Sequence, residues 1–196
     1  MTAASPDRLA TAADLARLAP EVRAEIVDGE LVEKAAAAPE HGVAQLGLGA
    51  QIFGPFHRRT GGAPPGGWWL MTEVDVEYDP HQVYRHDLVG WRRERVPRRP
   101  TGTPVQTRPD WVCEVLSPSN ARTDLVKKLR TLQKCEVPSY WILDPEHRTL
   151  TVLRWTPAGY LAALTAGATD VVRAEPFEAV EIHLDVVFAD ADEGSP

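Results

Sequence analysis

Residues 111–144, WVCEVLSPSNARTDLVKKLRTLQKCEVPSYWILD, decide the fold, because two apolar runs flank a helical pattern there. WVCEVL (111–116) and VPSYWILD (137–144) are short and mostly apolar, as strands buried on both faces are. Residues 124–135 between them carry leucines at helical spacing: Leu125, Leu129 and Leu132. A strand, a helix of about a dozen residues and a second strand form a right-handed parallel crossover in nearly all cases. We therefore predict this unit within an α/β domain.

The chain before this unit predicts more of the same sheet. WWLMTEVDVEY (68–78) and VYRHDLVGW (83–91) alternate as strands do and flank an Asp-Pro turn, so they predict a hairpin. Residues 40–59 place apolar side chains at helical spacing and predict an amphipathic helix. Residues 92–109 are rich in proline and arginine and are expected to form a loop.

We predict one domain that spans residues 1–196, including a helical segment at its N-terminus and a disordered tail at its C-terminus. Residues 1–19 read as a helical lead-in that Thr11 can cap. A short extended segment with a turn at Asp28-Gly29 follows. Residues 190–196 read as a disordered acidic tail.

Composition indicates an ordinary soluble protein, with 43% hydrophobic and 25% charged residues. No apolar run approaches the roughly 18 residues of a membrane span, and the N-terminus lacks the pattern of a secretory signal. Cys113 and Cys135 have no metal-ligand spacing and are expected to be reduced packing residues, with a disulfide left open. We expect a cytoplasmic protein without a membrane partner.

The net charge of −7 argues at first against a nucleic-acid partner, but the charges are unevenly distributed. Residues 85–99 hold six arginines against two acids, and residues 122–134 hold five basic residues against one acid. Two basic stretches on an acidic body could line a phosphate-binding groove. The alternative is that both are solvated faces, which is what most runs of charge are.

Two acids stand at unusual positions. Asp87 lies in the strand RHDLVGW, and Glu114 lies inside WVCEVL between apolar neighbours. A carboxylate in a buried strand is costly unless a partner compensates it, and Mg²⁺ is a suitable partner for oxygen ligands. The alternatives are that Glu114 forms a buried ion pair with an arginine of residues 92–108, and that Asp87 merely ends a strand.

A lysine beside such acids could orient a water molecule or neutralise developing charge. At 100° per residue, Lys128 falls roughly 60° from Leu125, at the edge of the leucine stripe, whereas Lys127 faces solvent. Lys128 is therefore the lysine expected to point inward. A simple helix pair between Lys128 and Asp124 is the competing explanation.

The runs RPDWVCEVLSPSN, TDLVKKL and VPSYWILDP, together with EIVDGEL, a histidine at 41 and HDLVGW, resemble the Uma-two family. That family is a bacterial branch of the PD-(D/E)xK nuclease superfamily, whose members are restriction-endonuclease-like. The resemblance spans about residues 20–190 and is most specific in residues 110–145. It implies a restriction-endonuclease-like core, a mixed β-sheet flanked by helices, with metal-dependent DNA cleavage.

Carried over by position, the resemblance makes Asp87 and Glu114 the two metal-binding acids. The superfamily lysine normally lies two residues after the second acid, where this chain has Leu116. In this family the lysine is expected on the following helix, which again indicates Lys128. The resemblance thus implies Asp87, Glu114 and Lys128 as catalytic residues and Mg²⁺, with Mn²⁺ as the other option, as cofactor.

The sequence departs from the family pattern at three positions. His86 replaces the proline before the first acid, a change expected to affect only the entry into the strand. Leu132 stands where tyrosine is frequent. Glu136 stands where glycine is frequent, which should weaken the end of the helix.

Further residues are candidates for a supporting role. His41 at the start of a helix could contact phosphate or the metal, although a structural role is the alternative. Glu25 and Glu30 flank the Asp28-Gly29 turn, and either could add an acid. Arg92 and Arg93 open the arginine loop and are candidate phosphate contacts. Asp144 is expected to cap the turn at Pro145 rather than bind metal.

Two functions therefore remain at this point. The first is a Mg²⁺-dependent endodeoxyribonuclease with DNA as its partner, possible as a homodimer because cutting both strands usually needs two active sites. The second is a catalytically inactive nuclease-fold module that binds nucleic acid or a protein partner, since a fold alone does not establish an activity.

Overall fold

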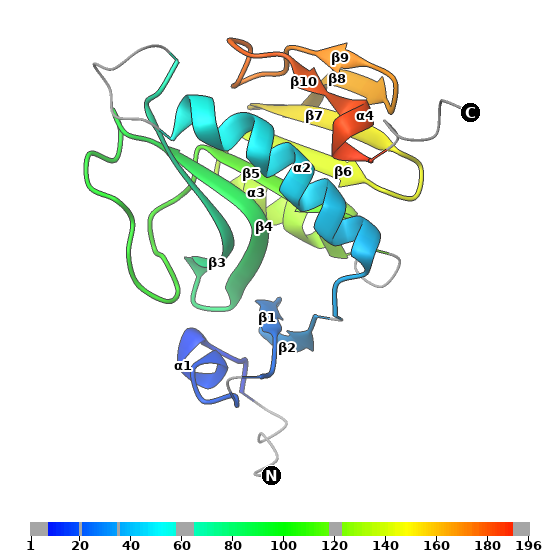
Figure 1. The fold of residues 1–196 in the computed structure, drawn as a ribbon. Helices are drawn as coiled ribbons and strands as arrows, with labels where there is room; N and C mark the ends of the chain where they lie inside the picture. Colours follow the sequence, from blue (N-terminus) through cyan, green and yellow to red (C-terminus); the bar gives the residue numbers. More distant parts are fainter. Residues whose placement is uncertain (1–7, 20, 35, 58–64, 118–122, 190–196) are drawn as a thin grey trace.

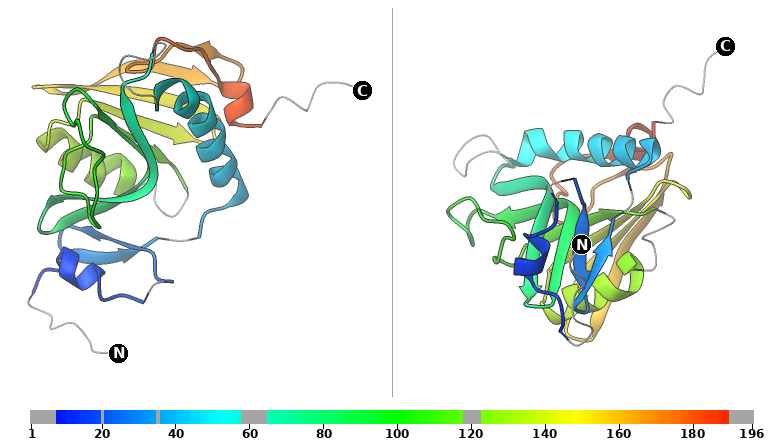
Figure 2. Two further views of the ribbon diagram at one scale, coloured as in Figure 1. Left: turned by 60° about the vertical axis from the view of Figure 1, so that its left-hand side comes forward. Right: turned by 90° about the horizontal axis from the view of Figure 1, so that it is seen from below.

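The computed structural model describes residues 8–19, 21–34, 36–57, 65–117 and 123–189. Its body is a mixed eight-stranded sheet in the order β2-β1-β4-β5-β6-β7-β8, with β3 paired to β4 (Figure 1). The strands of this sheet are β1 (Ala24–Val27), β2 (Glu30–Glu33), β3 (Trp68–Asp79), β4 (Gln82–Arg92), β5 (Trp111–Val115), β6 (Ser139–Asp144), β7 (Thr149–Thr156) and β8 (Gly159–Gly167). Helix α2 (Pro39–Phe56) crosses one face, and α3 (Leu129–Lys134) lies on the opposite face (Figure 2).

The predicted strand–helix–strand unit is present. β5 and β6 are parallel, and Trp111 lies opposite Ser139. The connecting helix differs from the prediction, because its first part is a π-helix, η1 (Thr123–Lys128), which continues into α3. A π-helix bonds i to i+5, so its side chains advance differently from those of an α-helix. The predicted stripe consequently fails at Leu125, which is exposed, but holds at Leu132, which is fully buried.

The predicted hairpin is confirmed as β3 and β4, which pair antiparallel from Trp68 opposite Arg92 to Asp79 opposite Gln82. Residues 93–110 contain no helix or strand and return to the sheet only at the bridge between Val105 and Val76, as expected of a loop.

The N-terminal prediction is confirmed only in part. β1 and β2 form the expected extended pair around Asp28-Gly29. The predicted helix is a single turn, α1 (Ala12–Leu15), where the Thr11 N–H donates to the Asp14 carboxylate at 2.9 Å. α1 buries no residue, and a helix without a packed face gains little stability in water. Residues 1–7 and 190–196, where a lead-in and a disordered tail are expected, lie outside the described residues.

Two apolar clusters sandwich the sheet. On the α2 face, Leu48 and Ile52 pack with Trp111 and Val115, and on the α3 face Val112 packs with other side chains of the sheet and of α3. β5 is therefore buried on both faces, as its apolar sequence predicted. Cys113 is buried and Cys135 is half-buried, and the two do not form a disulfide in this structure.

The C-terminal segment adds a two-stranded sheet of β9 (Val171–Val172) and β10 (Ile182–His183) and a one-turn helix, α4 (Leu184–Val187). This helix packs against α2 (Figure 1). Within the described residues, none of the helices has the length and hydropathy needed to cross a bilayer.

Candidate active site

Along one edge of β4, the middle residues lie in a gap between strands β1 and β5. β3 pairs along one edge of β4, whereas the other edge pairs with β1 at its beginning and with β5 only towards its end. Carboxylates replace the missing strand partners in this gap. Glu25 accepts the Arg85 N–H at 3.0 Å, and Asp87 accepts the Val115 N–H at 2.8 Å. Because buried backbone donors need acceptors, this geometry holds both acids in the gap.

The side chains of β4 change faces at Asp87. In a regular strand Tyr84 and Leu88, four residues apart, would face the same side. Here the Tyr84 hydroxyl bonds to Thr131 of α3, whereas Leu88 packs in the cluster on the α2 face. On the neighbouring strand, Glu73 has a φ of 54°, and the β3–β4 register contains no pair between Glu73 and Asp87. This local irregularity takes Asp87 out of the regular pleat, so that its carboxylate reaches polar groups rather than either apolar cluster.

Glu114 is fully buried, and both of its carboxylate oxygens have partners. Oε1 contacts His86 Nδ1, and Oε2 accepts from Lys128 Nζ at 3.1 Å. Lys128 Nζ also donates to Glu25 Oε1 at 2.9 Å. Glu114 thus pairs with a lysine and a histidine, and the alternative of a structural ion pair with an arginine of residues 92–108 is not what the structure shows.

Lys34 was not predicted and lies in the centre of the acids. Its Nζ is 3.0 Å from the Arg85 carbonyl oxygen, 3.2 Å from Asp87 Oδ1 and 3.5 Å from Glu25 Oε1. In the sequence, the only indication of an inward position is that Lys34 comes two residues after Val32, which places the two side chains on the same side of an extended chain. A single lysine after an exposed strand gives no reason to expect a role in a site.

His41 joins the cluster from the first turn of α2. Its Nε2 lies 3.6 Å from Asp87 Oδ1, an ion-pair distance rather than a good hydrogen bond. His41 is buried, and its Nδ1 has no hydrogen-bond partner among the described residues. The structure therefore places this predicted residue beside Asp87.

The environment shifts the pKa values of these groups in opposite directions. Burial alone would raise the pKa of Asp87, but His41 and the Lys34 charge hold it below its usual range. Burial raises the pKa of Glu114 to about 8, against the opposing effect of Lys128. The Asp87 carboxylate raises the pKa of His41. Two acids with pKa values pushed apart are typical of functional sites.

His86 has a larger role than the sequence suggested. It is fully buried, and burial together with the Lys128 charge lowers its pKa to about 3, so the ring is neutral. Its Nδ1 contacts Glu114 Oε1, and its Nε2 forms a hydrogen bond of 2.7 Å with the Tyr78 hydroxyl. The expectation that His86 affects only the entry into the strand is therefore wrong, because its ring bridges Tyr78 and Glu114.

Three other predicted residues lie away from the cluster. Glu30 is exposed on β2, opposite Val27. Arg92 ends β4, five residues and hence about 17 Å along the strand from Asp87. Arg93 stacks its guanidinium on Trp69, 3.6 Å from the ring centre. Asp144 accepts from the N–H groups of residues 146 and 147 and so caps a turn, as expected.

The donor set suits a hard divalent cation in its chemistry. Asp87, Glu114 and Glu25 offer carboxylate oxygens, the ligands that Mg²⁺ prefers. Within the described residues, however, no three acid, histidine or cysteine groups already form a metal-binding arrangement, and lysine ammonium groups lie among the carboxylates. Lys34 Nζ shows that three oxygens converge on a position for a cation. Asp87 and Glu25 contribute the two carboxylate oxygens at that position, whereas the oxygens of Glu114 contact His86 and Lys128.

Asp87 is reached through a small cleft of about 20 Å³, enough for one water molecule, which Lys34, His41 and Glu73 also line. A larger cleft of about 490 Å³, also lined by His41, lies between the start of α2 and the carboxyl ends of β5 and β6. Ligands in α/β proteins commonly bind outside the carboxyl ends of strands, so this cleft is suited to a substrate.

Comparisons with known proteins concern the fold and the family of the chain. In shape the chain is similar to a solved structure from Anabaena variabilis ATCC 29413, described as a "putative nuclease belonging to DUF820". The two share 18% sequence identity with a TM-score of 0.67, over 91% of this chain and 97% of the other. Such a match shows the fold, and it confirms the predicted mixed sheet flanked by helices. No curated protein matches the sequence.

A family model described as "Putative restriction endonuclease" matches residues 12–187, which include every residue of the cluster. The match extends over most of the chain. The protein belongs to the Uma2 family.

Proposed function

We propose that this protein is a Mg²⁺-dependent endodeoxyribonuclease that hydrolyses phosphodiester bonds at the Asp87–Glu114–Lys128 cluster. The observation that supports this most directly is that Asp87, Glu114 and Lys128, at most 41 residues apart in sequence, lie together as buried ionisable side chains. Buried charges are costly, and they persist where function requires them. The family description is consistent with a nuclease.

Each residue has a role that follows from its contacts. Asp87 and Glu114 would hold Mg²⁺, which when bound polarises a phosphoryl oxygen and lowers the pKa of an attacking water. Lys128 contacts Glu114 and Glu25 and so fixes the second acid and balances its charge. Lys34 lies beside Asp87, where its ammonium can compensate negative charge that develops on the phosphate.

A specific observation supports the second candidate, an inactive binding module. Both oxygens of Glu114 and both oxygens of Asp87 already have protein partners. A carboxylate that is satisfied by lysine gains less from a metal ion than an unpaired carboxylate does. Metal affinity therefore decides between the two candidates.

The test is calorimetric titration of Mg²⁺ and Mn²⁺ into the wild type, Glu114→Gln and Glu30→Gln, followed by cleavage assays on supercoiled and linear DNA. Glu30→Gln is the matched control because it removes an exposed acid outside the cluster. We expect saturable binding and cleavage in the wild type and in Glu30→Gln, and the loss of both in Glu114→Gln. If Glu114→Gln cuts DNA at the wild-type rate, the proposed site is wrong, and if metal-free protein binds DNA without ever cutting it, the inactive module is the better description.

A further inference from the structure

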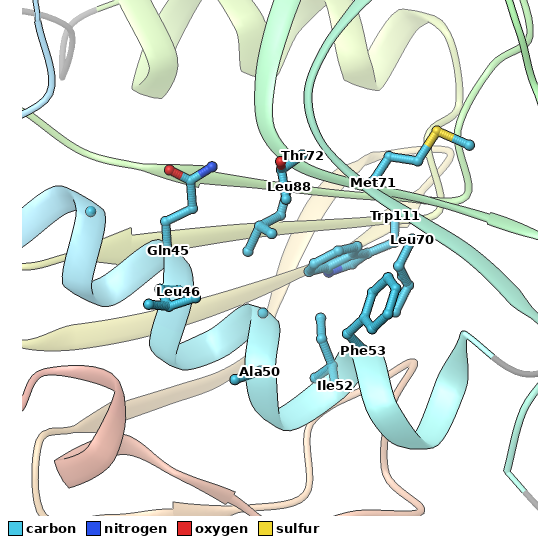
Figure 3. A pocket seen from close by; sticks show the side chains of 12 residues that line it. Gln45, Leu46, Ala50, Ile52, Phe53, Leu70, Met71, Thr72, Leu88 and Trp111 are labelled. Carbon is cyan, nitrogen blue, oxygen red and sulfur yellow. The ribbon is translucent and has the colours of Figure 1, made fainter.

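An apolar groove of about 560 Å³ runs along α2, between this helix and the β3 edge of the sheet (Figure 3). Its lining includes Gln45, Leu46, Phe53, Met71, Leu88 and Trp111. Leu46 is 73% exposed and Phe53 is 50% exposed, although both are large apolar side chains. A hollow of this size, with exposed apolar walls and few polar groups, is typical of a ligand site.

One end of the groove reaches the candidate active site. Gln45 lines the groove, and its Nε2 donates to the Asp87 carbonyl oxygen at 2.8 Å and to Glu73 Oε1 at 3.2 Å. Asp87 and Glu73 line the small cleft beside Lys34. A chain molecule that occupies the groove would therefore leave it next to the proposed metal-binding acids.

The other end of the groove meets aromatic rings and arginines. Phe53 stacks on His57, with ring centres 4.3 Å apart and an angle of 18° between the planes. Arg93 donates to the His57 carbonyl oxygen at 3.0 Å and stacks on Trp69. The loop that begins at Arg92 and ends at Arg99 carries five arginines and one acid. This end thus combines a half-exposed aromatic ring with positive charge, the combination that single-stranded nucleic acids bind.

The length of the groove suits several nucleotides. Gly42 and Phe53, the first and last residues of α2 that line the groove, are eleven residues apart, which corresponds to about 16 Å along the helix axis. At the B-form spacing of about 3.4 Å for each nucleotide of a strand, this is roughly five nucleotides.

We propose that this groove binds the unpaired nucleobases of a single-stranded DNA segment whose backbone passes the Asp87–Glu114 site. The inference rests on the proposed nuclease function and specifies its substrate. Duplex DNA keeps the faces of its bases stacked inside and would present base edges, sugar and phosphate to Leu46 and Phe53, which offer phosphate no partner and could stack on no base. A second copy of the chain fits less well, because a two-fold contact would place groove against groove and two concave surfaces leave a void between them.

The test is fluorescence anisotropy with the full-length protein in EDTA, so that no strand is cut. The probes are a labelled oligothymidylate, an abasic strand of the same length and a duplex of the same length. The variants are Phe53→Ala and Leu46→Ser, with Leu161→Ala as matched control, because Leu161 is an equally exposed apolar residue on β8, outside the groove. Circular dichroism and thermal melts establish that each variant is folded.

We expect the wild type to bind the base-bearing strand more tightly than the abasic strand or the duplex. Loss of one stacking contact should weaken binding of Phe53→Ala to that strand roughly 5- to 150-fold and leave its affinity for the abasic strand unchanged. Leu46→Ser should show a change in the same direction, and Leu161→Ala should bind as the wild type does.

Equal affinity for the base-bearing and abasic strands would overturn the inference, as would wild-type binding by both groove variants. A wild type that sediments as a dimer and that Phe53→Asp converts to a monomer, with unchanged DNA binding, would assign the groove to a second copy instead. The two proposals fail separately. Cleavage that survives in groove variants with unchanged strand affinity overturns only the groove, whereas base-dependent binding without metal-dependent cleavage overturns only the nuclease.

Discussion

Lys128 is almost fully buried between the carboxylates of Glu25 and Glu114. We predict that Lys128→Met lowers the free energy of unfolding by about 3–5 kcal/mol, because it removes the buried ammonium that pairs with Glu114, whereas Glu25 keeps Lys34. Adding Glu114→Gln should recover part of this loss, since the two groups are coupled. Urea unfolding of both single variants and the double variant measures the coupling. Lys127→Met, which removes only an exposed pair with Asp28, should change stability by about 1 kcal/mol or less.

Tyr78 acts on Glu114 only through His86, so it is a positioning residue. We predict that Tyr78→Phe weakens Mg²⁺ binding by roughly 10- to 100-fold, as the loss of partners behind metal ligands commonly does. Tyr160→Phe is the matched control, because it also removes a part-buried hydroxyl hydrogen bond, but one to the Val137 carbonyl oxygen and not to His86. Calorimetry compares the two affinities, and unfolding compares the two stabilities. Equal effects of both variants on metal binding would show that Tyr78 has no positioning role.

The sequence predicted the acids of this cluster better than their partners. Glu114 stands out because it is an acid between apolar residues, and Lys128 because it lies near a leucine stripe. Lys34 and His86 carry no such signal, since their importance arises from the gap in β4 that brings distant segments together. The prediction of Arg92 and Arg93 as phosphate contacts rests on charge alone. In the structure the Arg93 guanidinium stacks on Trp69 and donates hydrogen bonds to backbone carbonyl oxygens.

At the scale of elements, the glycines of α2 have different functions. A Cβ at Gly47 would lie 2.9 Å from the Cα of Val187 in α4, whereas a Cβ at Gly42 would meet nothing within 4 Å. We predict that Gly47→Ala destabilises the protein by roughly 1–3 kcal/mol through overpacking, and that Gly42→Ala stabilises it by about 1 kcal/mol through helix propensity. Thermal or urea unfolding decides the sign at each position. A stabilising Gly47→Ala would mean that α4 can move away from α2 at little cost.

Helices and strands with a regular spacing of apolar residues were predictable from the sequence. Features that depend on local backbone hydrogen bonds and dihedral angles were not. The parallel pair of β5 and β6 and the hairpin of β3 and β4 follow from apolar runs and turn residues. The π-helical start of η1 does not, because an i to i+5 bonding pattern leaves no mark in residue spacing. At the end of α3, Glu136 has a φ of 55°, so it occupies the left-handed region that glycine favours. This left-handed conformation is the physical reason to expect a less stable helix end at Glu136.

At the scale of the whole molecule, the number of charged residues in a stretch of sequence overstates the charge that this stretch exposes to solvent. The basic stretch of residues 122–134 does not form one solvated face, because Lys128 points into the site and Lys127 pairs with Asp28. In the other stretch, Arg85 forms a two-pronged pair with Asp75. The prediction of a phosphate-binding groove from these runs therefore depends on the remaining arginines of the loop after β4.

The site exists only in the folded molecule, because Glu25, Asp87 and Glu114 come from three strands and Lys34 and Lys128 from the segments beside them. A cation bound there stabilises the folded state alone. At a Mg²⁺ concentration one hundred times the dissociation constant, the expected gain is about 2.7 kcal/mol, which for a domain of this size raises Tm by roughly 5–11 °C. Differential scanning calorimetry with and without Mg²⁺, at constant ionic strength, measures this shift. Glu114→Gln should remove the shift and Glu30→Gln should retain it. A shift of equal size in both variants would place the bound ion elsewhere on this acidic protein, and the role proposed for Glu114 would then be wrong.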